Sequence, residues 1–143
     1  MPVSFVNQGI RLQLKNKKEI KNWIYSYIKN NQKIPGEINL IYCSDDYILE
    51  INKKYLNHNY YTDIITFNYN EENIISGDLF MSSQRIKDNA GKYNETLKRE
   101  ILRVIAHGIL HLFGLNDKTI GQQSLMRAEE EKFISSFPDV DII

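Results

Sequence analysis

The sequence lacks a second cysteine, a long apolar run and an excess of charge of either sign. Its only cysteine, Cys43, cannot form an internal disulfide and is expected to be a small buried apolar side chain. No apolar run approaches the roughly 20 residues that cross a bilayer. The first residues also lack the basic and then apolar order of a signal peptide. These absences predict a cytoplasmic protein that has no membrane partner.

The charge of the chain is balanced, because 18 basic and 18 acidic residues give a formal net charge of zero. A nucleic-acid backbone usually requires a basic surface, so this balance weighs against a strongly basic binding protein. The basic residues are unevenly placed, however, with lysines clustered between positions 15 and 21. A local basic face is therefore compatible with the sequence, and we expect no DNA partner.

The composition is that of an ordinary globular chain, with 42% apolar and 25% charged residues. We expect residues 1–143 to form one domain. Strands are expected at 2–6, 37–43, 62–69 and 74–81. Helices are expected at 17–31, 45–55, 83–91 and about 121–137, and a long helix capped by Asn94 is expected to carry the histidine motif. This order predicts an α+β fold in which about five helices cover a mixed sheet of about four strands.

Two of the three histidines lie four residues apart in the longest predicted helix. His107 and His111 would lie one turn apart on the same face, where they could share a metal ion. Gly114 can end the helix and turn the chain so that Asp117 becomes a third ligand. Three N and O ligands with an open position are typical of a catalytic zinc site, and other first-row divalent ions also suit them. The alternatives are a pair of core histidines and an Asp117 in a solvated turn.

The spacing of this motif, His-x-x-x-His-x-x-Gly-x-x-Asp, is that of metzincin-type zinc proteases with aspartate in place of their third histidine. The helix that carries it is therefore zincin-like. Zinc proteases use a glutamate directly after the first histidine as the general base. Here that residue is Gly108, which has no side chain for proton transfer. The motif thus favours a metal site but argues against a peptidase.

Three segments carry a family resemblance. The segment His107-Gly-Ile-Leu-His-Leu-Phe-Gly114 has the pattern His-Gly-x-Leu-His-Leu-x-Gly, which a third metal ligand follows. Two further motifs lie in residues 51–67 and 77–81, among them Thr-Asp-Ile-Ile-Thr-Phe and Gly-Asp-Leu-Phe-Met. In all three, the chain resembles the bacterial YbeY family of rRNA maturation factors.

The resemblance implies a zinc-dependent, single-strand-specific endoribonuclease. It implies action in late rRNA maturation, at the 16S 3′ end, and in ribosome quality control, with rRNA and the small ribosomal subunit as partners. Two other functions stay open. One is a non-catalytic, metal-containing ribosome assembly factor, and the other is a metal hydrolase of another substrate.

The chain departs from the family pattern at two positions. The usual third ligand of the family is histidine, whereas this chain has Asp117, which is also a competent zinc ligand. The family commonly has arginine directly after the tyrosine that corresponds to Tyr55, whereas this chain has Leu56. His58 and Arg85 are the candidates to supply the missing charge.

The sequence does not identify catalytic residues beyond the three predicted ligands. Histidines that bind a metal normally donate their second N–H to a carboxylate or a carbonyl. Asp63 and Asp78, on neighbouring predicted strands, are candidates for this role, although each could equally cap a strand end or a turn.

Overall fold

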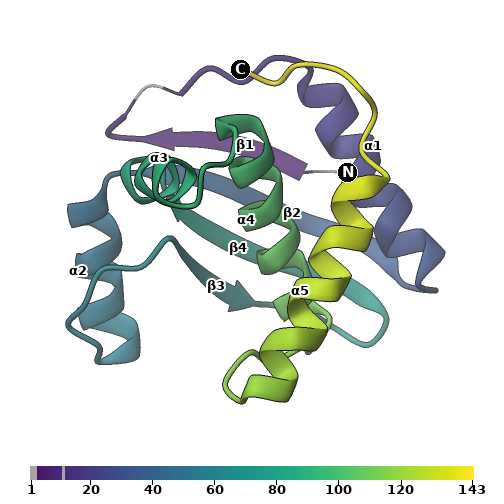
Figure 1. Cartoon of the computed structure of the whole chain (residues 1–143). Helices are drawn as coiled ribbons and strands as arrows, with labels where there is room; N and C mark the ends of the chain where they lie inside the picture. Colours follow the sequence, from purple (N-terminus) through teal and green to yellow (C-terminus); the bar gives the residue numbers. More distant parts are fainter. Residues whose placement is uncertain (1–2, 11) are drawn as a thin grey trace.

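The computed structural model describes residues 3–10 and 12–143, and Figure 1 shows how their helices and strands are arranged. The elements in chain order are β1 (Val3–Gln8), α1 (Lys17–Asn30), β2 (Ile34–Cys43), α2 (Asp45–Leu56), β3 (Ile64–Asn68), β4 (Ile74–Ser82), α3 (Ser83–Lys92), α4 (Leu97–Leu112) and α5 (Ile120–Ser135). Pro2, the predicted start of the first strand, lies outside the described residues. None of the helices in the described part of the chain has the length and apolarity that a membrane span requires.

The four strands form one mixed sheet in the order β1-β2-β4-β3. β1 and β4 both run parallel to β2, whereas β3 pairs antiparallel with β4 through a register that joins Ile64 to Met81. The predicted hairpin at 62–81 and the predicted α+β class with a mixed sheet and five helices are therefore confirmed.

The second strand begins at Ile34, three residues earlier than expected. The sequence Pro35-Gly36 predicted a loop, but Pro35 lies opposite Ile75 of β4, and a register shift of the β2–β4 pairing follows it, between Pro35 and Ile38. A bulge of this kind accommodates a proline, which has no N–H for the ladder. Gly36 is required there, since a Cβ would lie 2.2 Å from the Ser76 Oγ.

Helix α4 is capped by Thr96 and not by Asn94. The Thr96 hydroxyl accepts a hydrogen bond from the Arg99 N–H at 3.1 Å, as an N-cap side chain does. Asn94 has a left-handed backbone (φ 54°) and its N–H donates to the Gly91 carbonyl, so it belongs to the end of α3. Asn16 does precede α1, but its side chain donates to the Asp141 carbonyl and does not cap the helix.

Helix α4 lies in the main core, packed against the sheet and α5, and most of its residues are buried. It approaches the sheet closely at Gly108, where a Cβ would lie 2.4 Å from the Leu79 Cδ2 and 2.8 Å from the Ile64 Cδ1. A smaller cluster between α2 and the other face of the sheet buries Cys43, as predicted, beside Ile48. Gly108 thus has a packing role, and a larger side chain there would require Leu79 and Ile64 to shift.

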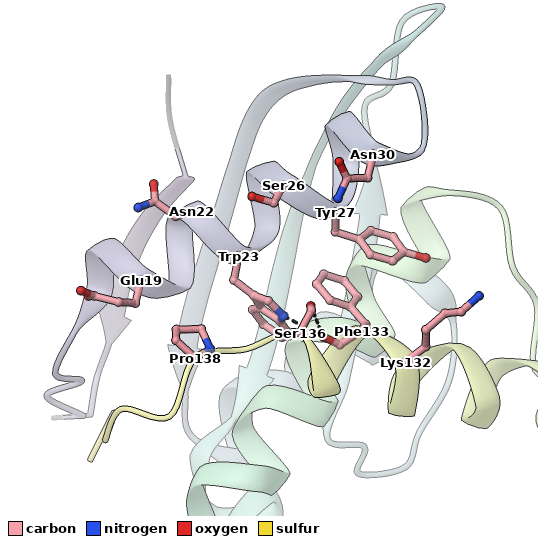
Figure 2. A pocket seen from close by; sticks show the side chains of 10 residues that line it. All are labelled: Glu19, Asn22, Trp23, Ser26, Tyr27, Asn30, Lys132, Phe133, Ser136 and Pro138. Carbon is pink, nitrogen blue, oxygen red and sulfur yellow. Dashed lines mark hydrogen bonds between the residues drawn. The ribbon is translucent and has the colours of Figure 1, made fainter.

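The C-terminal helix α5 is attached to α1 by aromatic contacts, which Figure 2 shows. The Trp23 Nε1–H donates to the Phe133 carbonyl at 2.8 Å, and the Tyr27 ring stacks on Phe133 at a centroid distance of 3.9 Å. A hollow of about 400 Å³ lies beside these rings, away from the histidines. These contacts fix the position of α5, which carries part of the site described below.

Candidate metal centre

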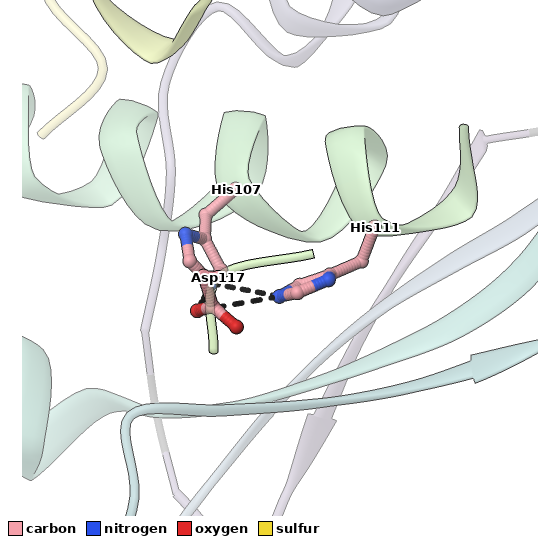
Figure 3. Close-up of side chains that lie close together, drawn as sticks. All are labelled: His107, His111 and Asp117. Atoms are coloured by element: carbon pink, nitrogen blue, oxygen red, sulfur yellow. Dashed lines mark hydrogen bonds and ion pairs between the residues drawn. The ribbon is translucent and has the colours of Figure 1, made fainter. Parts of the chain in front are cut away.

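The two histidines of α4 point their Nε2 atoms at each other, as Figure 3 shows. The distance between the Nε2 atoms of His107 and His111 is 3.0 Å. Both rings are partly buried, with side-chain exposures of 17% and 27%. One helical turn therefore brings the two nitrogens close enough to share one ion, as the spacing predicts.

Asp117 reaches the same point from the loop that follows α4. Gly114 has a left-handed backbone (φ 94°), and its N–H donates to the His111 carbonyl where the helix ends. The turn places the Asp117 Oδ2 3.2 Å from the His107 Nε2 and 3.7 Å from the His111 Nε2. One ligand atom from each side chain thus lies within 4.8 Å of the others, as a group that could hold a metal ion.

The other ring nitrogen of each histidine has its own partner. The His107 Nδ1 lies 2.5 Å from the Glu130 Oε2, and the His111 Nδ1 lies 2.9 Å from the Leu115 carbonyl oxygen. A carbonyl or an ionised carboxylate only accepts, so both Nδ1 atoms carry hydrogen. In the neutral rings the Nε2 atoms are then free of hydrogen and offer lone pairs.

This arrangement fits a bound cation. Two nitrogen lone pairs and a carboxylate oxygen converge on one point, where they repel one another unless a positive charge lies between them. At metal–ligand distances of about 2.05 Å, two ligands of a tetrahedral zinc site lie about 3.3 Å apart. The observed separations of 3.0, 3.2 and 3.7 Å bracket that value. The donor set and its spacing therefore suit zinc or a similar divalent ion.

The electrostatic environment keeps His111 unprotonated. Burial and then the neighbouring His107 lower the pKa of His111, although Asp117 and the Leu115 carbonyl partly oppose them. A metal ligand must be the neutral imidazole. A lowered pKa thus holds His111 ready to bind near neutral pH.

Behind the histidines lies a partly buried network of charges around Arg103. Its guanidinium lies 2.7 Å from a Glu100 oxygen, 3.1 Å from Asp63 and 3.6 Å from Glu130. Burial lowers the pKa of Arg103, but the hydrogen bonds and charges of Glu100, and then the charges of Asp63 and Glu130, raise it above its usual range. Arg103 is thus a permanent cation that holds Glu130 beside His107 across the α4–α5 interface.

Sequence reasoning missed Glu130. It is the middle one of three consecutive glutamates, 129–131, yet its side chain is only 6% exposed. A signal was available, because Glu130 lies four residues after Met126 and three before Phe133, both of which are buried on the inner face of α5. The Leu115 carbonyl has no sequence signal, since any residue would supply it.

Two expected supporting residues do not reach the histidines. Asp63 pairs with Arg103, and Asp78 accepts a hydrogen bond from the Asn39 amide at 2.9 Å. The Nδ1 atoms of the histidines bind other groups, so neither candidate aspartate has this role.

The two residues that were candidates to replace the charge of the family's arginine also lie away from the histidines. Arg85 forms an ion pair with Asp45 at 2.7 Å, and His58 lies 3.0 Å from the Tyr60 hydroxyl in an exposed loop. Neither lines the cavity beside the metal ligands. Leu56 itself is 41% exposed and carries no charge.

The cavity beside the ligands has a volume of about 480 Å³. His107 and Asp117 form part of its wall, and α5 contributes Gln123 and Arg127. The rest of the wall comes from the loop before β3 and from α3, α4 and α5, with Asp63, Asn89, Tyr93, Glu100, Arg103, Met126, Glu130 and Glu131. A substrate in this cavity would therefore lie directly beside His107 and Asp117, two of the three predicted ligands.

Comparison with known proteins identifies the family of this chain. The sequence pattern of the family described as Endoribonuclease YbeY matches residues 5–138. A protein named Endoribonuclease YbeY from Phocaeicola vulgatus is 47% identical over 133 residues, which cover 93% of this chain and 96% of the relative. Another of that name from Bacteroides fragilis is 44% identical over 135 residues, covering 94% and 97%. The resemblance predicted from the motifs is confirmed.

A solved structure has the same fold. A solution structure from Thermotoga maritima superposes with a TM-score of 0.63 at 26% identity. The match covers 94% of this chain and 87% of the other.

Proposed function

Since this chain belongs to the Endoribonuclease YbeY family, we propose that residues 1–143 form one domain that cleaves single-stranded RNA with a bound metal ion. One observation carries the proposal: the His107 Nε2, the His111 Nε2 and the Asp117 Oδ2 converge within 4.8 Å at the wall of a cavity. Such a donor set leaves a position open for substrate, as catalytic metal sites do.

The metal ion would be held by His107, His111 and Asp117. When bound, a divalent ion polarises a phosphoryl oxygen and offsets the charge that develops on it during cleavage. Glu130 and the Leu115 carbonyl keep the proton of each histidine on Nδ1, so that both Nε2 atoms face the site. Zinc is the metal we propose, because the ligand spacing suits a tetrahedral site.

The cellular role we propose follows from the family. It is late rRNA maturation at the 16S 3′ end and ribosome quality control in the cytoplasm, with rRNA and the small ribosomal subunit as partners. Balanced charge and an uncharged Leu56 favour a second candidate, a non-catalytic assembly factor that contains a metal. A peptidase is disfavoured, because Gly108 occupies the position of the glutamate that it needs.

The test compares purified wild-type protein with two histidine variants on single-stranded and double-stranded RNA of the same sequence. His111→Ala removes a proposed ligand, and His58→Ala removes the exposed histidine outside the site. We expect wild type and His58→Ala to cleave the single strand, and His111→Ala to lose cleavage while its circular dichroism spectrum is retained. The ends of the products identify the nucleophile: a 2′,3′-cyclic phosphate indicates the ribose hydroxyl, and a free 3′-hydroxyl indicates water. Equal cleavage by His111→Ala would contradict the proposal.

A further inference from the structure

The cavity beside the metal ligands is acidic, which is unexpected for a site that binds RNA. Five carboxylates and two arginines line it. A divalent ion at the histidines would still leave an excess of negative charge. RNA phosphates therefore need a further positive group that is free to contact them.

Arg103 cannot be that group, because its guanidinium is already paired with carboxylates of the protein. Three carboxylates surround its guanidinium, and two of them, Glu100 and Glu130, are almost completely buried. Turning Arg103 toward a ligand would leave the Glu100 carboxylate in the protein interior without the guanidinium that pairs with it, which is strongly unfavourable.

Arg127 is the other arginine of the cavity, and it is free. It lies in α5 one turn after Gln123, which also lines the cavity. Within residues 3–10 and 12–143, no carboxylate forms an ion pair with Arg127. Its natural partner one turn later would be Glu131, but that carboxylate binds Arg99 of α4 instead. The fold thus leaves one unpaired guanidinium in the wall of the site.

We propose that Arg127 binds a phosphate of the RNA strand in this cavity, and that it supplies the positive charge that Leu56 cannot. The proposal rests on the proposed function. A guanidinium presents five N–H donors in a planar fork that matches two phosphate oxygens, and it keeps its charge at every physiological pH. Arg127 is therefore a substrate-binding residue that orients the strand and does not transfer protons.

The test measures the binding of a fluorescent single-stranded RNA, fully 2′-O-methylated to slow cleavage, to the zinc-loaded protein by anisotropy at several salt concentrations. Arg127→Gln removes the charge, and Arg127→Lys keeps it without the fork. Lys132→Gln is the matched control, since Lys132 lies on the same helix, is 76% exposed and lines the other hollow. Zinc content is measured for each variant.

We expect Arg127→Gln to raise Kd about tenfold and to lower the slope of log affinity against log salt by about 0.7, the value for one phosphate contact on a single strand. Arg127→Lys should retain the slope and raise Kd about threefold. Lys132→Gln should change Kd less than twofold. If Arg127→Gln behaves as Lys132→Gln while wild type binds and cleaves RNA, this inference is overturned and the proposed function stands. If wild type neither binds nor cleaves RNA, both are overturned.

Discussion

Replacing Glu130 by glutamine should weaken metal binding about tenfold with little change in the fold. Glutamine has nearly the same volume and can still accept the hydrogen bond from His107, so the substitution removes mainly the negative charge. A hydrogen bond to a charged group contributes about 1.5–3 kcal/mol and a neutral one about 0.5–1.5 kcal/mol. The difference of about 1–1.5 kcal/mol corresponds to about tenfold in affinity.

The surroundings of Glu130 allow its charge to act on His107 at nearly full strength. Its side chain is 6% exposed, so solvent screens the charge little, and its oxygen lies 2.5 Å from the His107 Nδ1. Arg103 remains paired with Glu100 at 2.7 Å when the Glu130 charge is removed, so no buried cation loses all its partners. Glu130→Ala should weaken binding about 100-fold, because His107 then loses the group that fixes its proton and orientation.

The assay is competition for zinc between the protein and a chromophoric chelator at fixed pH, with thermal unfolding of the metal-free variants measured in parallel. Glu129→Gln is the matched control, since Glu129 is the neighbouring residue and contacts Tyr27 rather than the histidines. We expect its zinc affinity to stay within twofold of wild type. Equal affinities of wild type and Glu130→Gln would refute the reasoning that this carboxylate supports His107.

Three further predictions concern metal removal, packing and reactivity. Removing the metal with a chelator should lower the Tm of wild type, measured by scanning calorimetry, by about 10 °C, because an ion present at about 1,000 times its Kd contributes about 4 kcal/mol to stability. The chelator should cause no such shift in His111→Ala. Gly108→Ala should lower the free energy of unfolding, measured by urea titration, by about 1–3 kcal/mol, because its Cβ would lie 2.4 Å from the Leu79 Cδ2. The control is Gly121→Ala, whose Cβ meets nothing within 4 Å and which should be neutral or stabilising. Burial and then Asp45 raise the pKa of Cys43 from 9.0 to about 12, so a thiol reagent at pH 8 should label Cys43 only in denaturant. The stability that the protonated thiol contributes should be complete below pH 9 and lost as the pH rises toward 12. Rapid labelling of the native protein would contradict this.

Local patterns predicted the helices and the hairpin, because these depend on apolar periodicity. In the predicted helix at 17–31, for example, Ile20, Trp23 and Ile24 recur at helical spacing, and all three are buried in α1. The patterns failed where two elements compete for one residue. Asn94 has the chemistry of an N-cap, but the end of α3 uses it, and Thr96 caps α4 instead. Pro35 is a residue typical of turns, but it lies in β2, next to a register shift of the β2–β4 pairing.

The candidate site could be predicted only in part, for a similar reason. The three expected ligands lie within one segment of 11 residues, so helix geometry and one glycine turn suffice to bring them together. The groups that support them come from other elements. Glu130 reaches His107 only because α5 packs against α4, and Asp63 reaches Arg103 from the loop before β3. Sequence spacing places Glu130 on the inner face of α5, but it does not indicate which residue of α4 lies opposite.

The most direct test is the rate of single-stranded RNA cleavage as zinc is added to metal-free protein. The rate should be negligible without zinc, rise linearly, and stop rising at one ion per chain. In Asp117→Ala, the same titration should require far more zinc and reach a lower rate, because one of the three predicted ligands is lost. Full cleavage by the metal-free protein, or an unchanged titration for Asp117→Ala, would contradict a catalytic metal centre at His107, His111 and Asp117.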